Sequence, residues 1–479
     1  MNILSDILYW LFLALFLYTI VIVISAILLE NRNPLKSIAW VLVLVLLPVV
    51  GLIIYIFVGQ DFRRRKIISK KSIKKLSKPA ARDFNFKLFE DDSTCLPQEQ
   101  KLIRLLYANS DAYPYANSKL EVYANGRETF DALFNDLEHA EHHIHLEFYI
   151  IADDVVGNQL REILIKKAKA GVRVRVIYDY LGGFRLSKLY LESLRHAGVY
   201  IQPFLPPKRV LGFSKINYRN HRKIAIVDGK VGYIGGINIA DRYLFGNHLG
   251  QWRDTQLRIE GVAVRGLQRS FLIDWFFVDN KFITNPKYFP IVEPPRTKNY
   301  VQIVGSGPDS DWETVMQGVV MMIAGATDYV YVHTPYFIPT ESVILALETA
   351  ALSGVDVRIM LPEKSDTYFV GLASDSYIQR ILEAGVRVFF YQNNFLHSKT
   401  IVVDNRVATV GTANMDVRSY EQNFEINAFV FDEKVTLNLK RLFMKDLRFC
   451  REVRLDVWKR RNHWCRFKES LARLFSPLM

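Results

Sequence analysis

The sequence predicts an α/β fold in which two copies of one α/β/α sandwich face a central cleft, preceded by an N-terminal transmembrane helical hairpin. Three observations predict it: two long apolar runs near the N-terminus, alternating helix and strand patterns in the rest of the chain, and repetition of these patterns in the same order. At 479 residues the chain can hold two domain-sized cores. Half of its residues are hydrophobic, which is a high share for a purely soluble protein.

The two apolar runs predict two transmembrane helices within residues 1–60. Residues 7–29 carry no charged side chain, and such a run is long enough to cross the ~30 Å hydrocarbon core of a bilayer. Residues 37–58 form the second run, and they include Pro48 and Gly51, which membrane helices tolerate. We therefore expect a hairpin of helices over 7–29 and 37–58.

The segment after the second run indicates how the hairpin is oriented. Residues 61–110 are predicted to form a basic juxtamembrane linker. Its first part is crowded with basic residues, namely Arg63, Arg64, Arg65, Lys66, Lys70, Lys71, Lys74, Lys75 and Lys78. Because positively charged flanks stay in the cytoplasm, we expect a multi-pass protein whose remaining chain is cytoplasmic. The same residues would attract anionic lipid headgroups.

The overall charge points to an anionic partner. Lys and Arg outnumber Asp and Glu by 62 to 49, which gives a net charge of +13. Nucleic acid, an anionic membrane surface and a phosphorylated substrate all fit that excess. The three cysteines, Cys95, Cys450 and Cys465, are odd in number and widely spaced. They predict neither a disulfide framework nor a thiolate metal site, which suits a reducing compartment.

The rest of the chain is duplicated, with halves over residues 111–290 and 291–455 and a basic amphipathic tail over 456–479. Each half reads as helix, Gly, strand, helix, Gly, strand, which is typical of α/β folds with a largely parallel sheet. The matching segments are 170–172 with 353–355, 197–199 with 384–386, 221–228 with 397–404, and 235–238 with 411–414. Two halves related by a two-fold axis would bring equivalent segments together at one cleft.

Each half carries the pattern His-x-Lys-x4-Asp, and these residues are our candidate catalytic residues. The six are His221, Lys223, Asp228, His397, Lys399 and Asp404. Side chains two positions apart in a strand share a face, so each His projects together with its Lys. A Gly-rich bend after the returning strand brings Asn238, or Asn414 in the second half, back toward the same end. One copy is a weak signal, whereas two copies inside a repeat are a strong one.

Two imidazoles, two ammonium groups and two amides in one cleft suit chemistry on a phosphodiester. The lysines and the amides of Asn238 and Asn414 can hold the nonbridging oxygens as negative charge grows on them. One histidine can attack phosphorus while the other protonates the departing alkoxide, because an unperturbed imidazole titrates near pH ~6.5. A covalent phosphohistidine would split one difficult displacement into two easier ones.

Each histidine also needs a carboxylate to orient its second ring nitrogen. Asp254 follows the first motif, and Glu425 follows the second at a comparable place. We therefore expect Asp254 to support His221 and Glu425 to support His397.

Other polar segments are expected to have structural or peripheral roles. Asp228 and Asp404 lie at the ends of their strands, where we expect them to brace the turn by hydrogen bonds. The insert over 206–216 precedes the first motif only, and it fits a lid, a membrane-contacting loop or an ordinary variable loop. The cluster of His142, His143 and His145 with Glu141 and Glu147 is compatible with a metal site, but its alternation favours a strand that enters the sheet, from which Glu147 can still reach the cleft. Nothing else has metal-ligand or nucleotide-binding spacing, so we predict no metal and no cofactor.

The tail combines aromatic and basic residues at helical spacing. Trp458, Trp464, Phe467, Leu471 and Phe475 lie among many Lys and Arg residues. Such a segment is typical of a basic amphipathic helix that lies on a membrane surface. Packing on the body of the protein is the alternative.

The paired motifs resemble those of the phospholipase D superfamily, and the whole chain resembles the bacterial cardiolipin synthases within it. The segments that carry the likeness are ENRNPLKSIAWVLVLVLLPVVGLIIYIFVG, the two motifs, GTANMDVRSYEQNFEIN and the ending RLFSPLM. The resemblance implies phospholipase D-like halves and a membrane phosphatidyltransferase that joins two phosphatidylglycerol molecules into cardiolipin and releases glycerol. It also implies a covalent phosphatidyl intermediate on His221, with His397 as acid and then base, in a bacterial plasma membrane.

Three other functions stay open on the residues alone. A hydrolytic phospholipase D, or a phosphatidyltransferase with another alcohol acceptor, would use the same catalytic groups. A nuclease is disfavoured by the hairpin and by the lack of an interleaved base-stacking platform, so we expect no nucleic acid partner. A non-enzymatic scaffold is disfavoured because both histidines and both lysines are present. The expected partners are phosphatidylglycerol and cardiolipin in an anionic membrane, and the oligomeric state, a homodimer included, stays open.

Overall fold

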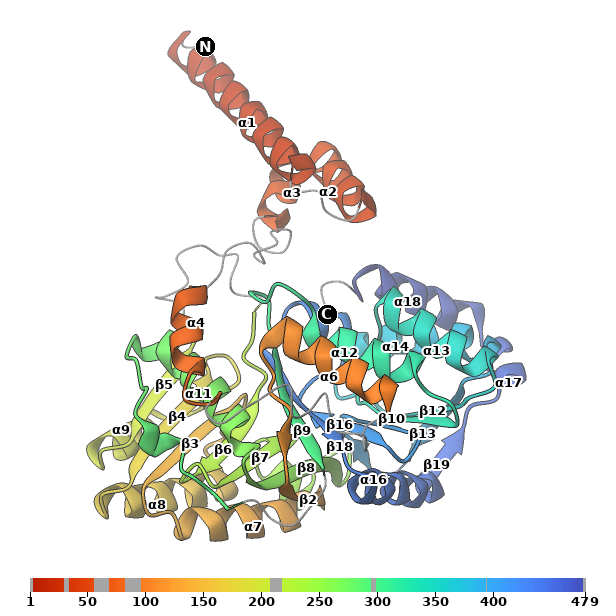
Figure 1. Cartoon of the computed structure of the whole chain (residues 1–479). Coiled ribbons are helices and arrows are strands. Elements are labelled where there is room, and N and C mark those ends of the chain that lie inside the picture. Colours follow the sequence, from red (N-terminus) through yellow and green to blue (C-terminus); the bar gives the residue numbers. More distant parts are fainter. Residues whose placement is uncertain are drawn as a thin grey trace. The chain divides into compact units, whose positions relative to one another are not determined.

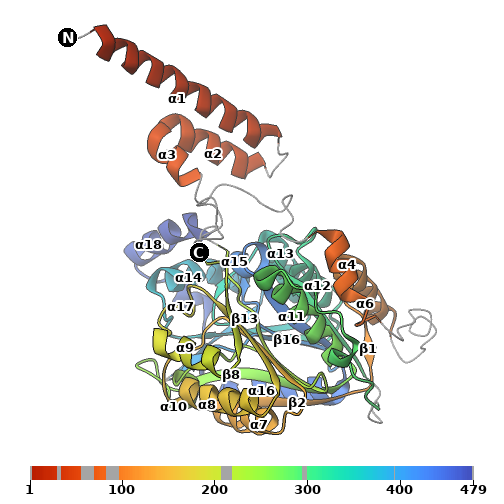
Figure 2. The same ribbon diagram turned by 90° about the vertical axis from the view of Figure 1, so that its left-hand side faces the viewer.

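The computed structural model describes residues 3–29, 34–55, 69–81, 96–206, 218–293, 299–392 and 394–476. The chain forms two compact units, which are Met1–Phe62 with Leu205–Asn217, and Arg63–Phe204 with Tyr218–Met479. Most of the insert predicted over 206–216, the basic residues at 63–66 and Cys95 lie outside the described residues. Figures 1 and 2 show the chain from two directions.

Three helices form the described part of the N-terminal unit. α1 (Ile3–Leu29) contains the stretch Asp6–Leu29, whose 24 residues are long and apolar enough to cross a membrane. The second apolar run forms α2 (Pro34–Leu46) and α3 (Pro48–Ile54). Ile27, Leu44 and Tyr55 are buried together, so α1 packs against α2 and the end of α3.

The break between α2 and α3 differs from the predicted single helix over 37–58. Leu47 has φ −130° and ψ 64°, outside the helical region. The cause is the proline that follows, because its ring clashes with a helical conformation of the residue before it. Among the described residues, one helix has the length and hydropathy of a membrane span, so the two-helix hairpin stays a prediction.

The larger unit holds two mixed sheets, and the first has eight strands in the order β14-β8-β7-β6-β3-β4-β5, with β2 paired to β8. Its parallel strands are β3 (His143–Phe148), β4 (Arg173–Asp179) and β5 (Tyr200–Phe204). Its antiparallel strands are β2 (Ser118–Asn125), β6 (Lys223–Val227), β7 (Val231–Gly235) and β8 (Trp252–Gly261). One face is covered by α7 (Gly126–Glu138), α8 (Val155–Lys169) and α9 (Lys188–His196), and the other by α11 (Val264–Asp279) (Figure 1).

The second sheet repeats this plan with nine strands in the order β1-β9-β18-β16-β15-β10-β12-β13-β19. Its parallel strands are β10 (Tyr329–His333), β12 (Asp356–Pro362) and β13 (Arg387–Tyr391). Its antiparallel strands are β1 (Tyr115–Ala116), β9 (Tyr300–Ser306), β15 (Thr400–Val403), β16 (Val407–Gly411), β18 (Glu425–Phe431) and β19 (Cys450–Glu452). One face is covered by α6 (Pro97–Ser110), α12 (Thr314–Ala324), α13 (Glu341–Leu352) and α14 (Tyr368–Glu383), and the other by α16 (Glu433–Asp446) (Figure 1).

The predicted duplicated α/β fold is therefore confirmed. β14 (Phe395–Leu396) comes from the second half yet pairs in parallel with β8, so no single cut along the chain separates the sheets. The predicted boundaries at 110, 290 and 455 stay predictions. The shorter described elements are α4 (Lys70–Ser77), α10 (Arg242–Phe245), η4 (Pro286–Tyr288), β11 (Phe337–Ile338), β17 (Met415–Asp416), α15 (Val417–Glu421), η5 (Leu447–Phe449), α17 (Leu455–Lys459) and α18 (His463–Leu474).

The repeated Gly-Val signature has a conformational cause. Gly171 and Gly354 have φ +92° and +95°, and both lie just after a helix and just before a strand. No atom lies within 4 Å of a Cβ added at either glycine, so backbone conformation and not space favours glycine there. The N–H of Val172 bonds back to the carbonyl of Lys167, which ends the helix and turns the chain into the sheet.

Candidate active site

The two motifs begin immediately before equivalent strands. His221 precedes β6, and His397 precedes β15. The Nζ of Lys223 donates a hydrogen bond to the carbonyl oxygen of His221 at 2.6 Å, and Lys399 does the same to His397. Each lysine is thus tied to the residue two positions earlier, on the shared face that strand alternation predicts.

Each motif histidine pairs with the carboxylate of the other half. Nδ1 of His221 lies 3.0 Å from both carboxylate oxygens of Glu425, and Nδ1 of His397 lies 2.6 Å from Oδ2 of Asp254. This corrects the expectation that Asp254 supports His221 and that Glu425 supports His397. Both carboxylates do orient a histidine, but the pairs are exchanged between the halves.

The backbone explains the exchange. The N–H of His221 donates to the carbonyl of Phe424 at 2.9 Å, directly beside Glu425. The N–H of His397 donates to the carbonyl of Arg253 at 2.8 Å, directly beside Asp254. The segment that leads into each motif therefore extends the other half's sheet, and it brings each histidine to the strand that carries the opposite carboxylate.

Burial lowers the pKa of both histidines. The pKa of His221 falls to about 4, because burial and Lys223 outweigh the opposing charge of Glu425. The pKa of His397 lies well below its ordinary value because of burial, Lys399, Lys223 and His221. Groups of both halves act on His397, so the two motifs share one buried site.

The lysines carry depressed proton affinities as well. Burial lowers the pKa of Lys223 to about 7, with Glu425 opposing and Lys399 adding to the effect. Burial lowers the pKa of Lys399 to about 8, opposed by Asp254 and Glu425. Two ammonium groups this close and this buried favour an anionic ligand, because a bound negative charge would stabilise both of their charged forms.

The two carboxylates differ in proton affinity. Burial raises the pKa of Asp254 to about 6, against the opposing effects of Lys399 and the Thr255 N–H. Burial also raises the pKa of Glu425, but His221 and Lys223 outweigh it and leave that pKa below its ordinary value. Glu425 is therefore held as a carboxylate.

Glu425 accepts more hydrogen bonds from neighbouring groups than Asp254 does. Glu425 accepts hydrogen bonds from Thr412 Oγ at 2.5 Å and from Asn423 Nδ2 at 3.1 Å. Asp254 accepts one from the Thr255 N–H at 2.7 Å. The different hydrogen-bond sets agree with the different proton affinities, because hydrogen bonds to the charged form stabilise it.

The motif aspartates lie at the far ends of their strands, where they accept hydrogen bonds from backbone N–H groups. Asp228 accepts hydrogen bonds from the N–H groups of residues 141, 142 and 143, each at 2.8 Å. Asp404 accepts from the N–H groups of residues 327, 328 and 329, at 2.6, 2.9 and 2.8 Å. Each therefore fixes the chain that enters the neighbouring antiparallel strand, β3 or β10, which agrees with the expected bracing and differs from a place among the reacting groups.

The two asparagines also use their amides locally. Asn238 Oδ1 accepts from the N–H of Ile150 at 3.0 Å, and its Nδ2 donates to the Tyr243 hydroxyl at 2.7 Å. Asn414 Nδ2 donates to Asp416 at 3.1 Å, while its buried Oδ1 has no hydrogen-bond partner among the described residues. We expected these amides to lie near the motif lysines and hold the substrate, and they bond to Ile150, to Tyr243 of α10 and to Asp416 of β17, so their predicted contact with substrate stays a prediction.

Apart from Glu147, sequence reasoning missed the residues that flank His221. The Tyr149 ring lies edge-on to the His221 ring with centroids 5.1 Å apart. Asn220 Nδ2 donates to buried Glu147 at 2.5 Å. Arg222 pairs with buried Asp274 and donates from Nε to the carbonyl of Glu425 at 3.2 Å. The pattern around the first motif gives no sign of this buried ion pair.

The histidine cluster at 142–145 serves the first sheet. His143 and His145 lie in β3, and both approach the side-chain amide of Gln268 on α11, at 3.0 and 2.8 Å. His145 Nε2 also lies 3.0 Å from Arg175. Across the described ranges no group of three or more His, Cys, Asp or Glu side chains is arranged to hold a metal ion.

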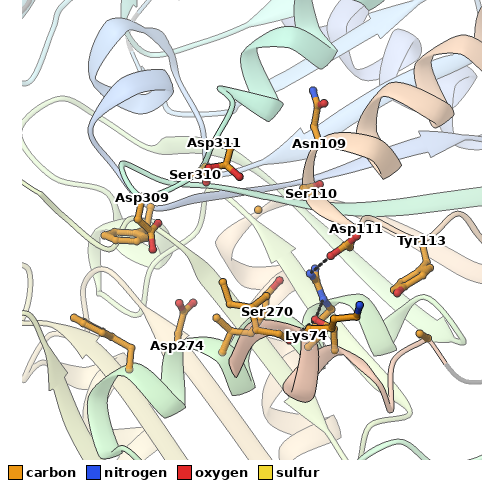
Figure 3. Close-up of a pocket in the computed structure, with 18 of the residues that line it drawn as sticks. Lys74, Asn109, Ser110, Asp111, Tyr113, Ser270, Asp274, Asp309, Ser310 and Asp311 are labelled. Atoms are coloured by element: carbon orange, nitrogen blue, oxygen red, sulfur yellow. Dashed lines mark hydrogen bonds and ion pairs between the residues drawn. The ribbon is translucent and has the colours of Figure 1, made fainter. Parts of the chain in front are cut away.

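A pocket of about 660 Å³ lies between both halves, beside this site. Its walls include α4, the end of α6, α11 and the loop at 309–311, and charges of both signs line it, as Lys74, Asp111, Asp274, Asp309 and Asp311 show in Figure 3. Arg222 and Phe424 form part of the wall, whereas His221 and His397 do not line it. The pocket is therefore adjacent to the histidine site and separate from it.

Comparisons with known proteins agree with this geometry. The family described as "Cardiolipin synthase, PLD-like domain" matches residues 133–256 and 319–447, one stretch in each half. A second family, described as "Phospholipase_D-nuclease N-terminal", matches residues 14–60.

Curated relatives match almost the whole chain. The cardiolipin synthase of Oceanobacillus iheyensis is 42% identical over 97% of this chain and 98% of its own length. The major cardiolipin synthase ClsA of Bacillus subtilis is 41% identical, with the same coverage of 97% and 98%.

A solved structure supports the fold. The crystal structure of phosphatidylserine synthase from Haemophilus influenzae Rd KW20 aligns with a TM-score of 0.61 at 13% identity, over 79% of this chain and 100% of that chain. At this low sequence identity, the match supports the fold of the two sheets and says nothing about substrate or residue roles. The family match in both halves and the full-length relatives carry the assignment, so this chain belongs to the cardiolipin synthase family and is a phosphatidyltransferase of the phospholipase D superfamily.

Proposed function

We propose that this protein converts two phosphatidylglycerol molecules into cardiolipin and glycerol, through a phosphatidyl group held covalently on His221. The single observation that carries the proposal is the crossed pair of histidine–carboxylate contacts, His221 with Glu425 and His397 with Asp254, beside two buried lysines. The relatives named cardiolipin synthase support this choice of substrate and product.

In the first step, Nε2 of His221 attacks the phosphorus of one phosphatidylglycerol. The bond between phosphorus and the glycerol oxygen breaks, and His397 gives its proton to that oxygen, so glycerol leaves. In the second step, His397 takes the proton of a hydroxyl on a second phosphatidylglycerol. That oxygen attacks phosphorus, the phosphorus–nitrogen bond breaks, and cardiolipin leaves with His221 free. Phosphodiesters are exchanged one for one, so the reaction needs no nucleotide.

The unequal carboxylates support this order. A nucleophilic histidine must be unprotonated on Nε2, and a His221 pKa of about 4 keeps it so at neutral pH. The ionised Glu425 can then accept a hydrogen bond from the Nδ1–H of His221 and orient the ring. Asp254, with a pKa raised to about 6, lets the Asp254–His397 pair retain a proton more readily, which suits the general acid.

A bound phosphodiester would bring a negative charge to the two lysines and to His397. The phosphodiester anion would lie beside Lys223 and Lys399 and would raise the pKa values of both lysines and of His397 toward their charged forms. The lysines would then stabilise the negative charge that grows on the nonbridging oxygens. We assign Asp228 and Asp404 to bracing of the fold, on the strength of their backbone hydrogen bonds.

We further propose that both N-terminal apolar runs are inserted in a bacterial plasma membrane and that the catalytic unit faces the cytoplasm. The long apolar helix α1 and the basic residues after the second run support this arrangement. A catalytic site next to the bilayer would favour a lipid alcohol over water as the acceptor, because it raises the local concentration of lipid.

A product assay tests the reaction. The purified full-length protein receives phosphatidylglycerol labelled in the phosphate and, separately, in the terminal glycerol. We expect labelled cardiolipin and free glycerol in equal amounts. Phosphatidic acid as the only lipid product would identify a hydrolase, and phosphatidyl transfer to an added small alcohol without cardiolipin would identify another acceptor.

Trapping the intermediate tests the nucleophile. Reactions with phosphate-labelled substrate are stopped by rapid denaturation in detergent at alkaline pH, which spares phosphorus–nitrogen bonds. We expect label on the peptide that contains His221. Label on the peptide with His397 would reverse the assignment while leaving the overall reaction in place.

A further inference from the structure

The C-terminal helix α18 attaches to the body of the protein by one face only. It packs along α14 (Figures 1 and 2), and its buried side chains include Glu469 and Ala472. Arg461 holds Glu469 through two hydrogen bonds at 2.7 and 2.9 Å, and the guanidinium of Arg473 lies 4.5 Å from the Tyr377 ring of α14. The side chain of Asn462 caps the helix by accepting from the N–H of Trp464 at 2.9 Å. These contacts fix the rotation of the helix about its axis.

The outward face of α18 is apolar and aromatic. Its exposed side chains are Trp464 (60%), Phe467 (55%), Leu471 (48%), Leu474 (75%) and Phe475 (50%). They recur every three or four residues, so they form one continuous stripe along the helix. The rings of Trp464 and Phe467 stack with centroids 5.4 Å apart, which holds them together on that face. Large apolar side chains gathered in one exposed patch mark an interaction surface.

Basic side chains flank this stripe. Arg466 is exposed on one side, and Lys468 lies on the other with its Nζ 5.7 Å from the Trp464 ring. Over residues 455–476, basic residues outnumber acidic ones. A second copy of the chain docked symmetrically on this face would bring these like charges together. An anionic lipid surface would instead attract the basic flanks while the stripe enters the acyl boundary.

We infer that α18 lies in the interface of an anionic bilayer, with Trp464, Phe467 and Leu471 inserted and the basic flanks at the headgroups. The helix thereby forms a second membrane attachment, on the second half of the fold, in addition to the N-terminal helices. Packing on the body of the protein and contact with the membrane, which were alternatives in the sequence, belong to opposite faces of the same helix. The inference goes beyond the proposed reaction, because it concerns how the catalytic unit is held at its lipid substrate.

The test measures the fluorescence emission of Trp464 in the full-length protein, which is reconstituted in lipid nanodiscs. Subtracting the spectrum of Trp464→Phe from that of the native protein isolates Trp464 from the other tryptophans. In discs of phosphatidylglycerol and brominated phosphatidylcholine, we expect bromine near the headgroup end of the acyl chain to quench the difference signal. We expect bromine at the chain end to quench it less, because interfacial helices insert only ~5–10 Å. A signal quenched by aqueous acrylamide and not by brominated lipid would overturn the inference, and so would a signal shielded from both.

Variants separate membrane contact from folding and from chemistry. Phe467→Asp places a charge in the stripe, and Leu352→Asp places the same charge at an exposed leucine of α13 as a matched control. We expect Phe467→Asp to reduce bromine quenching of Trp464 and to lower turnover in discs, with turnover in detergent micelles kept. Equal effects of both variants in discs would overturn the inference. The quenching needs no turnover, so a failure of the proposed reaction would leave this test intact.

Discussion

The two histidine sites are built from the same parts, yet they hold protons differently. His221 faces Glu425, whose carboxylate has hydrogen-bond donors around it and a lowered pKa. His397 faces Asp254, whose pKa is raised to about 6. Duplication supplied one scaffold twice, yet burial raises the pKa of Asp254 whereas His221 and Lys223 lower that of Glu425, so the two carboxylates shift in opposite directions. That difference supports the unequal roles that we propose for the two histidines in a symmetric fold, a nucleophile and an acid.

Equal behaviour of the two histidines would contradict their proposed roles most clearly. We expect His221→Ala to abolish cardiolipin formation and labelling of the protein, because it removes the atom that bonds phosphorus. We expect His397→Ala to slow turnover by roughly 10²–10⁴-fold, the usual contribution of a general acid. Labelled protein should still form in His397→Ala when the substrate carries a good leaving group that needs no protonation. His196→Ala changes an exposed histidine of α9 and serves as the control. Labelling of His221→Ala under those conditions would contradict the unequal roles.

The residues that follow the two histidines, Arg222 and Ser398, should contribute unequally to the stability of the protein. Arg222 forms a buried ion pair with Asp274, whereas Ser398 shares a 2.7 Å hydrogen bond with Thr255. Removing one partner of a buried ion pair costs about 3–5 kcal/mol, while a neutral hydrogen bond contributes about 0.5–1.5 kcal/mol. We therefore expect Asp274→Asn to lower the denaturation midpoint far more than Ser398→Ala.

Activity at low temperature separates folding from positioning for the same two variants. Arg222 also holds the carbonyl of Glu425, so Asp274→Asn should reduce kcat even where the protein is fully folded. A small, equal loss of stability in both variants, with kcat unchanged, would show that this ion pair plays no special part behind His221.

The acid limb of the pH profile tests which carboxylate serves which histidine. His221 must be neutral to attack, so kcat/KM should fall as the pH drops through its pKa of about 4 in the free protein. Glu425 raises that pKa, and Glu425→Gln should therefore move the limb to lower pH while it lowers the plateau. Asp254→Asn should lower the plateau and leave the limb in place. A limb that moves with Asp254→Asn instead would restore pairing in chain order, and recovery of activity on return to neutral pH is the control for unfolding.

The fold could be predicted because its signals are local. The glycines after the helices, the turns at Asp228 and Asp404, and the alternation of His and Lys all lie within a few residues of what they determine. The pairing of the histidines could not be predicted, because it depends on how two sheets dock. Glu425 is 204 residues from His221, and Asp254 is 143 residues from His397. Chain order made each nearer carboxylate look like the partner, and the exchanged backbone contacts decided otherwise.

The smallest effect is expected where the two halves are most alike. Asp228 and Asp404 each accept three backbone hydrogen bonds at the start of an equivalent strand. Replacing either with Asn keeps the shape and removes the charge, which should cost about 1–2 kcal/mol of stability, as for a lost helix cap. Because each carboxylate binds backbone at the end of its strand opposite the motif histidine, we expect kcat to change little in either variant at temperatures where it is folded. A large loss of kcat from one variant only, with its denaturation midpoint unchanged, would place that aspartate in the chemistry and would make the two halves unequal at this position as well.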